Sequence, residues 1–370
     1  MPARPTGPVA VRGCCHLFYA LDIGFSVDLK HCAGLIEDAR EDPAWRHHAR
    51  TPPSLNLRPM PVAISQGMKP IQGRTFRTDD RVTITVYDFG AVSVEYRTAF
   101  EGTFDQVAAL SSELYDNREF AVDAHRRAEA LLEAIRPAVL RPMVRAESED
   151  YLVFEIPELP EGHRDLDRLL ADQGQALARV LSSNTKALSS QQQREELSGR
   201  IAYYADDLTI ITWNAALICG TDMEDVLTLL ELANVQLREL HCLDEQLDDS
   251  LQESYDVRAR MANVKARMRR IRELMLDGQS FSETVTNAFK PFPDAFLARV
   301  YSLASESLGL NRFDQSIQGK LRLLNTLYTT LADEAAHERS VRLEWIVIVL
   351  IFIEIILGLS EKLLPWLQHR

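Results

Sequence analysis

The chain has 370 residues, of which 46% are hydrophobic and 26% are charged, and its formal net charge at pH 7 is −13. This length is enough for two folded units, since domains typically contain about 100 to 200 residues. The acidic balance argues against a surface coated with basic residues for nucleic acid, so we expect no DNA among the partners. Any anionic partner would need a local basic patch.

The five cysteines favour a reduced, cytosolic protein, because they are odd in number and form neither CxxC pairs nor another paired framework. The stretch Cys14-Cys15-His16 and the pair His47-His48 carry metal-binding residue types. They lack the ordinary spacing of metal ligands, so we predict no metal site and no cofactor. The N-terminal residues contain proline and glycine where a secretory signal has an unbroken apolar run, so no export signal is expected.

The first 220 residues alternate between strand and helix patterns. The expected elements are a strand within 16–29, a helix near 31–41, a hairpin over 82–97, helices at 104–115 and 119–135, a strand at 150–156, a helix at 166–181 and a strand at 207–218. The hairpin is the clearest, because apolar residues alternate on both sides of a turn that contains Phe89 and Gly90. We predict a disordered N-terminus over 1–14 and an α+β domain over 15–220.

Beyond this domain, apolar residues follow heptad spacing, which is typical of coiled-coil helices. One seam covers 223–251, and a second seam over 257–275 is out of phase with the first. The helix is therefore expected to bend or break near Tyr255. Because a further heptad pattern covers 321–335, we predict a helical hairpin or coiled-coil region over 221–340 and a chain that is mainly α overall.

Charges of opposite sign occupy two stretches of the predicted long helix. Residues 224–253 contain nine acidic residues and one arginine. Residues 258–272 contain no acid and seven basic residues, which are Arg258, Arg260, Lys265, Arg267, Arg269, Arg270 and Arg272. This basic stretch suits the phosphates of RNA or anionic lipid headgroups, with each residue acting as a charge contact rather than a reader of sequence. The alternative, which we favour, is that it pairs with acidic segments of this chain or of a neighbouring subunit.

The most apolar stretch of the sequence begins after Arg342 and runs to Leu359. A helix over 345–359 spans about 22 Å at ~1.5 Å per residue, so the leucines that follow must help it to cross a hydrocarbon core of about 30 Å. We predict a short or tilted transmembrane helix over 343–364, followed by a short tail at 365–370. The residues expected to form this membrane anchor are Arg342, Leu343, Glu344, Trp345, Glu354, Gly358 and Trp366.

The flanking residues set the expected topology. Trp345 and Trp366 lie near the two ends of the apolar stretch, where indole rings favour the headgroup zone, and Arg339 and Arg342 flank its N-terminal side. This arrangement predicts a tail-anchored protein whose large N-terminal part lies in the cytoplasm. The alternative is that the stretch is a buried core helix of a soluble protein.

Glu354 interrupts the apolar stretch, and an ionised acid at mid-bilayer costs about 2.5 to 3.5 kcal/mol on insertion scales. It should therefore be protonated or partnered. Glu354, Gly358 and Glu361 share one helix face, and such small or polar stripes are where membrane helices approach one another. We predict a homo-oligomer in the lipid bilayer.

Sequence motifs of well-known enzyme classes are missing: the chain contains no GxxxxGK[ST], GxGxxG, HExxH or GxSxG. Asp206 and Asp207 precede a predicted strand that contains Asn214, and together they could form a polar cluster around a substrate or metal. The simpler interpretation is that the aspartates start the strand and Asn214 holds a turn or a backbone group. We predict no catalytic residues.

The stretch 337–354 resembles the end of the family named for required for meiotic nuclear division protein 1, also called domain of unknown function 155. That family closes with a histidine and arginines, followed by a Leu-Glu-Trp that opens a hydrophobic helix with a later glutamate. The matching residues are His337, Arg339, Arg342, Leu343, Glu344, Trp345 and Glu354. Glu338 departs from the pattern, because the family tends to be basic there. A weaker likeness covers 19–29, 87–94 and 203–237.

This resemblance implies an integral membrane protein, whose eukaryotic relatives reside in the mitochondrial inner membrane, support organellar translation and are expected to tether ribosomes. The family supplies no catalytic residues to carry over. For this chain the resemblance implies a single-pass protein of a bacterial inner membrane, with the N-terminal domain in the cytoplasm.

The leading hypothesis is a non-enzymatic, membrane-anchored scaffold or tether that self-associates through its helical arms and its membrane helix. One alternative is a protein that tethers RNA or the ribosome through the basic stretch 258–272. Another is a membrane-bound enzyme with a site at Asp206, Asp207 and Asn214, which requires these side chains to converge in one place.

Overall fold

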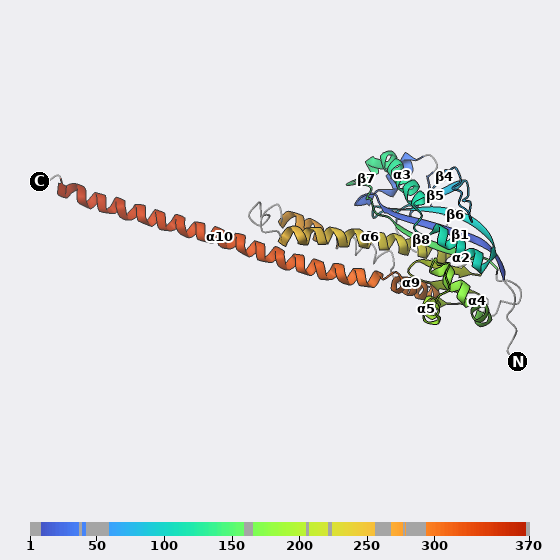
Figure 1. Cartoon of the computed structure of the whole chain (residues 1–370). Helices are drawn as coiled ribbons and strands as arrows, with labels where there is room; N and C mark the ends of the chain where they lie inside the picture. Colours follow the sequence, from blue (N-terminus) through green and yellow to red (C-terminus); the bar gives the residue numbers. More distant parts are fainter. Residues whose placement is uncertain are drawn as a thin grey trace. The chain divides into compact units, whose positions relative to one another are not determined.

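The chain divides into two compact units, one formed by residues 1–244 and 280–315 and the other by residues 245–279 and 316–370. Figure 1 shows the chain in a computed structural model. The structure describes residues 9–36, 39–41, 59–158, 166–204, 207–220, 224–255, 268–276, 278 and 294–367. The first unit contains the sheet, and the described residues of the second unit are helical.

A nine-stranded sheet is the centre of the first unit, with the strand order β3-β4-β5-β6-β1-β8-β11-β10-β9. Its strands are β1 (Ala10–Asp22), β3 (Ala39–Glu41), β4 (Val62–Gly67), β5 (Arg81–Val86), β6 (Ala91–Thr103), β8 (Glu149–Ile156), β9 (Arg200–Ile201), β10 (Leu208–Ile211) and β11 (Ala215–Cys219). Neighbouring strands are antiparallel except β8 and β11, which run parallel. A small second sheet pairs β2 (Ser26–Val27) with β7 (Val139–Leu140).

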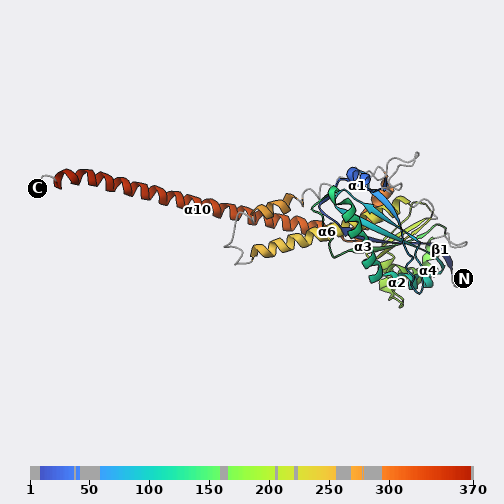
Figure 2. The same ribbon diagram turned by 90° about the horizontal axis from the view of Figure 1, so that it is seen from above.

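Helices connect the strands and extend beyond them. They are α1 (Leu29–Leu35), α2 (Phe104–Leu114), α3 (Arg118–Ile135), the 3-10 turn η2 (Arg136–Ala138), α4 (Leu166–Leu181), α5 (Ser190–Glu196), α6 (Glu224–Tyr255), α9 (Ala295–Ser307) and α10 (Leu310–Leu367). Residues 268–276 are also helical. Both α6 and α10 contribute residues to each unit. Figure 2 shows α10 as one continuous helix.

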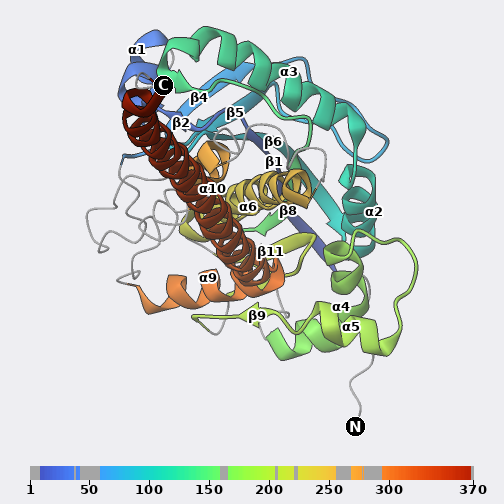
Figure 3. The same ribbon diagram turned by 90° about the vertical axis from the view of Figure 1, so that its left-hand side faces the viewer.

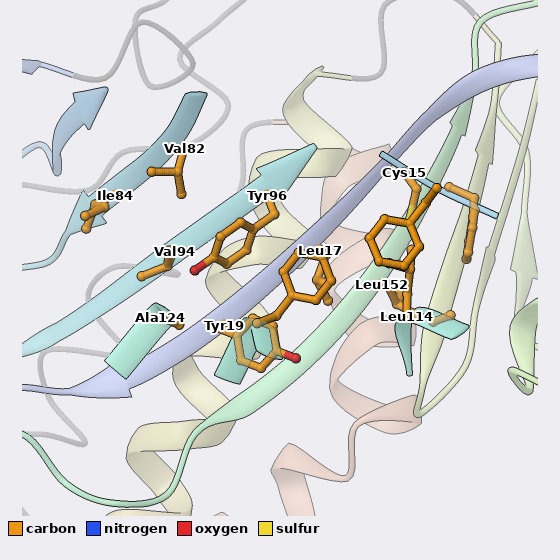
Figure 4. Packing of buried hydrophobic residues seen from close by; sticks show 14 of the residues in the cluster. Cys15, Leu17, Tyr19, Val82, Ile84, Val94, Tyr96, Leu114, Ala124 and Leu152 are labelled. Atoms are coloured by element: carbon orange, nitrogen blue, oxygen red, sulfur yellow. The ribbon is translucent and has the colours of Figure 1, made fainter. Parts of the chain in front are cut away.

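The two long strands β1 and β6 have 13 residues each and pair along their whole length. Because side chains alternate across a strand, Leu17 and Tyr19 point to one face of the sheet, where they pack with apolar residues of α2, α3 and α4 (Figure 4). On the other face Ala20 packs with Leu232 and Val235 of α6. Figure 3 shows α2 and α3 on one side of the sheet and the first part of α6 on the other. The sheet is therefore a layer covered on both faces.

Local capping explains where several helices begin. The side chain of Thr103 accepts a hydrogen bond from the backbone of Gln106, and the Gln106 side chain accepts one from the Thr103 backbone, which completes a capping box at the start of α2. Asn117 caps α3 and Asp294 caps α9, each with a side-chain oxygen that accepts from the backbone of the first turn. These short polar residues therefore mark where a strand or loop ends and a helix begins.

The hairpin, the helices at α2, α3 and α4 and the strand at β8 confirm the local predictions for those stretches. The predicted fold class, mainly α overall with an α+β domain, is wrong, because the N-terminal part is an α/β domain with a large sheet. Local patterns indicate which residues form strands but not which strands pair. After β8 the chain forms α4, α5, β9 and β10, and only then does β11 pair in parallel with β8.

Two boundaries also differ from the predictions. Residues 10–14, expected to be disordered, belong to β1, because the long partner strand β6 pairs as far as Ala10 with Thr103. The single strand expected over 207–218 is a hairpin of β10 and β11, and the backbone N–H of Thr212 donates to the carbonyl of Ala215 across its turn at 2.9 Å. The run is apolar on both faces, so the period of its side chains did not reveal the turn at Trp213.

The predicted transmembrane helix is wrong as well. In the part of the chain that the structure describes, no helix has an apolar stretch long enough to cross a membrane. The uninterrupted apolar run at 345–353 has nine residues, or about 14 Å of helix, against a hydrocarbon core of about 30 Å, and Glu354 ends it. The same finding overturns the tail-anchored topology and the placement in a bacterial inner membrane.

Candidate functional site

The apolar segment of α10, residues 343–356, has twelve large apolar side chains and two glutamates. Each of the twelve is between 47% and 64% exposed, with Ile353 and Trp345 at the two limits. Successive residues of a helix point in directions about 100° apart, so this segment is apolar on nearly all sides. Figure 2 shows that it lies in the continuous length of α10. A surface of this kind marks an interaction site.

Burial of this segment against a partner would contribute a large free energy. Full burial of one large aliphatic or aromatic side chain contributes about 1.5 to 3 kcal/mol. Twelve such side chains that are about half exposed leave on the order of 10 kcal/mol of burial unrealised. Other apolar residues of the second unit differ, since Leu247, Ile317 and Leu324 are buried. An ion pair of 2.7 Å between Lys320 and Asp248 joins α10 to α6 within this unit.

The residues predicted to anchor the chain in a membrane all lie on α10. Leu343, Glu344, Trp345 and Glu354 have exposed side chains. The helix also includes Arg342, Gly358 and Trp366, whose side chains are outside the described part of the structure. The described part of the predicted stretch is thus exposed along α10, although the predicted membrane surroundings were wrong.

Only part of the basic stretch 258–272 lies within the described residues. Arg258, Arg260, Lys265 and Arg267 are outside them. Arg269, Arg270 and Arg272 are exposed on the helical residues 268–276, whereas Ile271 and Leu274 of the same helix are buried. The structure does not test whether these arginines bind RNA, and that role stays a prediction.

The residues of the predicted enzyme site have separate structural partners. Asp207 precedes β10, and its carboxylate accepts the backbone N–H groups of Tyr203 and Tyr204 at 2.8 and 2.9 Å. Asn214 lies at the other end of β10, where its side-chain amide donates to the hydroxyl of Ser183 at 2.7 Å. Asp206 is outside the described residues. The described pair therefore organises two loops and does not converge on one place.

Between the sheet and α6 lies a largely buried group of polar and charged residues that the sequence did not single out. Asp22, at the end of β1, accepts a hydrogen bond from Nε of Arg145 at 3.1 Å and one from the thiol of Cys242 at 2.8 Å. The neighbouring residues Arg238 and Glu239 of α6 are also buried. We name these five residues the α6 ionic cluster.

Burial and like charge shift the titration of this cluster. Burial raises the pKa of Glu239 well above its usual range, and the charge of Asp22 adds to this, whereas Arg238 and Arg145 oppose it. Burial, followed by the charges of Asp22 and Glu239, raises the pKa of Cys242. The thiol is therefore held protonated as a donor to Asp22, and it is a poor nucleophile at neutral pH.

A neighbouring loop runs along the same side of α6. The amide of Asn234 donates to the backbone carbonyl of Glu149 at 3.1 Å, and His241 forms an ion pair with the carboxylate of Glu149. Nη2 of Arg238 lies 3.7 Å from Oε2 of Glu147. Asn234, Arg238 and His241 are four and three residues apart, so they face this loop together. The sequence signal was Arg238, the single arginine within the acidic stretch of α6.

A second charged group lies on the same face of the sheet, at His16 of β1. Its Nδ1 is 2.7 Å from Oε1 of Glu95, and its Nε2 is 3.1 Å from Oε2 of Glu155. Burial lowers the pKa of His16, but hydrogen bonds with Cys14, Glu155 and Glu95 outweigh burial and raise it well above its usual range. The hydrogen bond from His16 in turn lowers the pKa of Glu155. This group joins β6, β1 and β8.

Within the described ranges, no three histidine, cysteine or acidic residues are grouped so that they could hold a metal ion. The comparison with curated proteins gave no match, and neither did the comparison with solved structures. A family model described as "Uncharacterized protein MJ0711, N-terminal domain" matches residues 12–225. The matching model does not carry the name "required for meiotic nuclear division protein 1", so membership under that name is not confirmed. Because it covers more than half of the chain and nearly the whole sheet, the chain belongs to the family of the uncharacterized protein MJ0711 N-terminal domain.

Proposed function

We propose that the chain is a non-enzymatic scaffold that self-associates through the apolar segment of α10. The observation that supports this proposal is the exposure of twelve large apolar side chains in one uninterrupted helical segment. A helix that is apolar all round is normally enclosed by other apolar surfaces. The α/β domain then becomes a unit that the assembled helices carry in several copies.

A second copy of the same segment is the occupant that fits best. One groove covers one face of a helix, whereas a bundle of identical helices encloses each member from several sides. Identical segments have identical lengths, so copies can bury the whole of 343–356 against one another. Closed assemblies of one chain are the commonest form of oligomer and use one surface repeatedly.

The two glutamates of the segment should oppose the association. Parallel copies bring Glu354 of one chain to the level of Glu354 of the next. Antiparallel copies centred on Val349 bring Glu344 to the level of Glu354. Like charges therefore meet at the bundle in either orientation and weaken the association. Replacing Glu354 with a neutral residue of similar size should strengthen it.

The decisive measurement is the mass of the full-length chain, by sedimentation velocity over a range of concentrations. The wild-type chain should form a discrete species with a multiple of the 41.9 kDa chain mass. The triple variant Val347→Gln, Ile351→Gln and Ile355→Gln should shift toward the mass of one chain. Glutamine retains good helix propensity and adds no charge, so the helix itself should persist. Glu354→Gln should move the equilibrium in the opposite direction.

A matched control places three glutamines elsewhere on the same helix. Thr326, Thr329 and Thr330 are exposed residues of α10 outside the apolar segment. Their replacement with glutamine should leave the mass distribution unchanged. A wild-type chain that stays a single-chain species at high concentration would refute the proposal, as would a triple apolar-segment variant with an unchanged mass.

A further inference from the structure

Arg238 carries an unusual pair of atoms. Its side chain is only 1% exposed, and neither its Nε nor its Nη2 has a hydrogen-bond partner among the described residues. These two nitrogens form the edge of the guanidinium group that binds both oxygens of a carboxylate or phosphate in parallel. A buried charge without adequate partners costs several kcal/mol. This edge of Arg238 is therefore chemically suited to an oxyanion.

The neighbouring acids do not fill that role. Oε2 of Glu147 is 3.7 Å from Nη2, beyond hydrogen-bond reach, and the Glu147 side chain is 59% exposed. The carboxylate of Asp22 already accepts from Arg145 and Cys242. Burial, followed by the charge of Asp22, raises the pKa of Glu239 well above its usual range, which weakens this acid as a countercharge for Arg238.

Asn234 adds an acceptor on the same face of α6. It precedes Arg238 by four residues on α6, so the two side chains share a helix face. Its Nδ2 donates to the carbonyl of Glu149, but its buried Oδ1 has no hydrogen-bond partner in the described part of the chain. An acceptor on the same helix face as two donors suits a group such as hydrogen phosphate, which has both anionic oxygens and a hydroxyl.

We propose that the Nε–Nη2 edge of Arg238 binds a small oxyanion of phosphate or carboxylate type, for which the carboxylate of Glu147 competes. Glu147 is exposed enough to move into solvent when the ligand arrives, which leaves Arg238 with a bidentate partner. The site lies wholly within the first unit, so it does not depend on self-association through α10.

The test follows the side-chain Nε–H signal of Arg238 by NMR in the full-length chain, with the signal assigned by its loss in Arg238→Lys. Inorganic phosphate and acetate are titrated separately, with sodium chloride at matched ionic strength as the reference. Phosphate or acetate should shift this signal in a saturable manner, and chloride should not. The oxyanion that binds more tightly identifies the tetrahedral or the planar class.

Two variants and a matched control separate the site from general charge effects. Glu147→Gln removes the competing carboxylate and should tighten oxyanion binding several-fold, while Glu133→Gln, at an exposed residue of α3, should leave it unchanged. Arg238→Lys keeps the charge but loses the two-donor edge, so binding followed by calorimetry should weaken roughly tenfold or more. A signal that phosphate and acetate leave unmoved in both the wild-type chain and Glu147→Gln would overturn the proposal, whether or not Arg238→Lys folds.

Discussion

The sheet of the first unit and the apolar segment of α10 contain the same kinds of residues in opposite surroundings. Phe154 and Ile210 in the sheet are fully buried, whereas Phe352 and Ile351 of α10 are more than half exposed. A strand needs neighbours for its backbone hydrogen bonds, and these neighbours also bring covering side chains. A helix forms its backbone hydrogen bonds internally. The apolar segment can therefore exist as a helix before any partner covers it.

The largest expected effect comes from one substitution made in each region. Phe154→Ala should lower the free energy of unfolding by about 3 to 5 kcal/mol, because it leaves a cavity in the sheet core. Phe352→Ala should change the unfolding of the single chain by less than about 0.5 kcal/mol, because its side chain is exposed there. Chemical denaturation at low protein concentration, followed by circular dichroism, measures both values. Equal losses would show that the apolar segment is part of the core of its own chain.

A smaller effect with a pH dependence should appear at His16. His16→Gln removes a protonated group that two carboxylates bind, at a cost of about 2 kcal/mol. The folded chain raises the pKa of His16, so this contribution is fully present below the unfolded value near 6.5 and is lost as pH rises through the folded value. The stability difference between wild type and variant should therefore be larger at about pH 6 than at about pH 9.

Denaturation curves at the two pH values provide this measurement, and His31→Gln, at an exposed position of α1, is the matched control. A difference for His16→Gln that grows with rising pH would contradict the assigned charge state. Unlike the exposed side chains of the apolar segment, the buried charge of His16 is stable only when its carboxylate partners are in place.

The smallest effect concerns the junction between β6 and α2. Thr103→Ala removes half of the capping box and should lower the free energy of unfolding by about 1 kcal/mol. Thr329→Ala, at an exposed position within α10, should have no destabilising effect, since alanine favours a helix interior more than threonine does. Thermal unfolding of both variants tests this. A loss at Thr329 as large as that at Thr103 would show that α10 depends on side chains that are exposed in this structure.

Local patterns identified a substantial part of the fold. The alternation over β5 and β6 and the helical periods over α2, α3 and α4 come from neighbouring residues, so the sequence alone predicted these elements. The pairing of β11 with β8 was not predictable in this way, because it joins strands about 60 residues apart. The bond between Asp22 and Cys242 spans 220 residues and left no local pattern either.

By itself, the sequence determined which stretches are strands or helices and that residues near Leu350 form an exceptionally apolar helix, because periodicity and composition are properties of neighbouring residues. Only the tertiary structure decided what surrounds each stretch. It showed that Asp207 and Asn214 serve separate loops and that Arg238 is buried beside Glu147. These outcomes depend on contacts between distant residues, and such contacts exist only once the sheet and α6 have packed together.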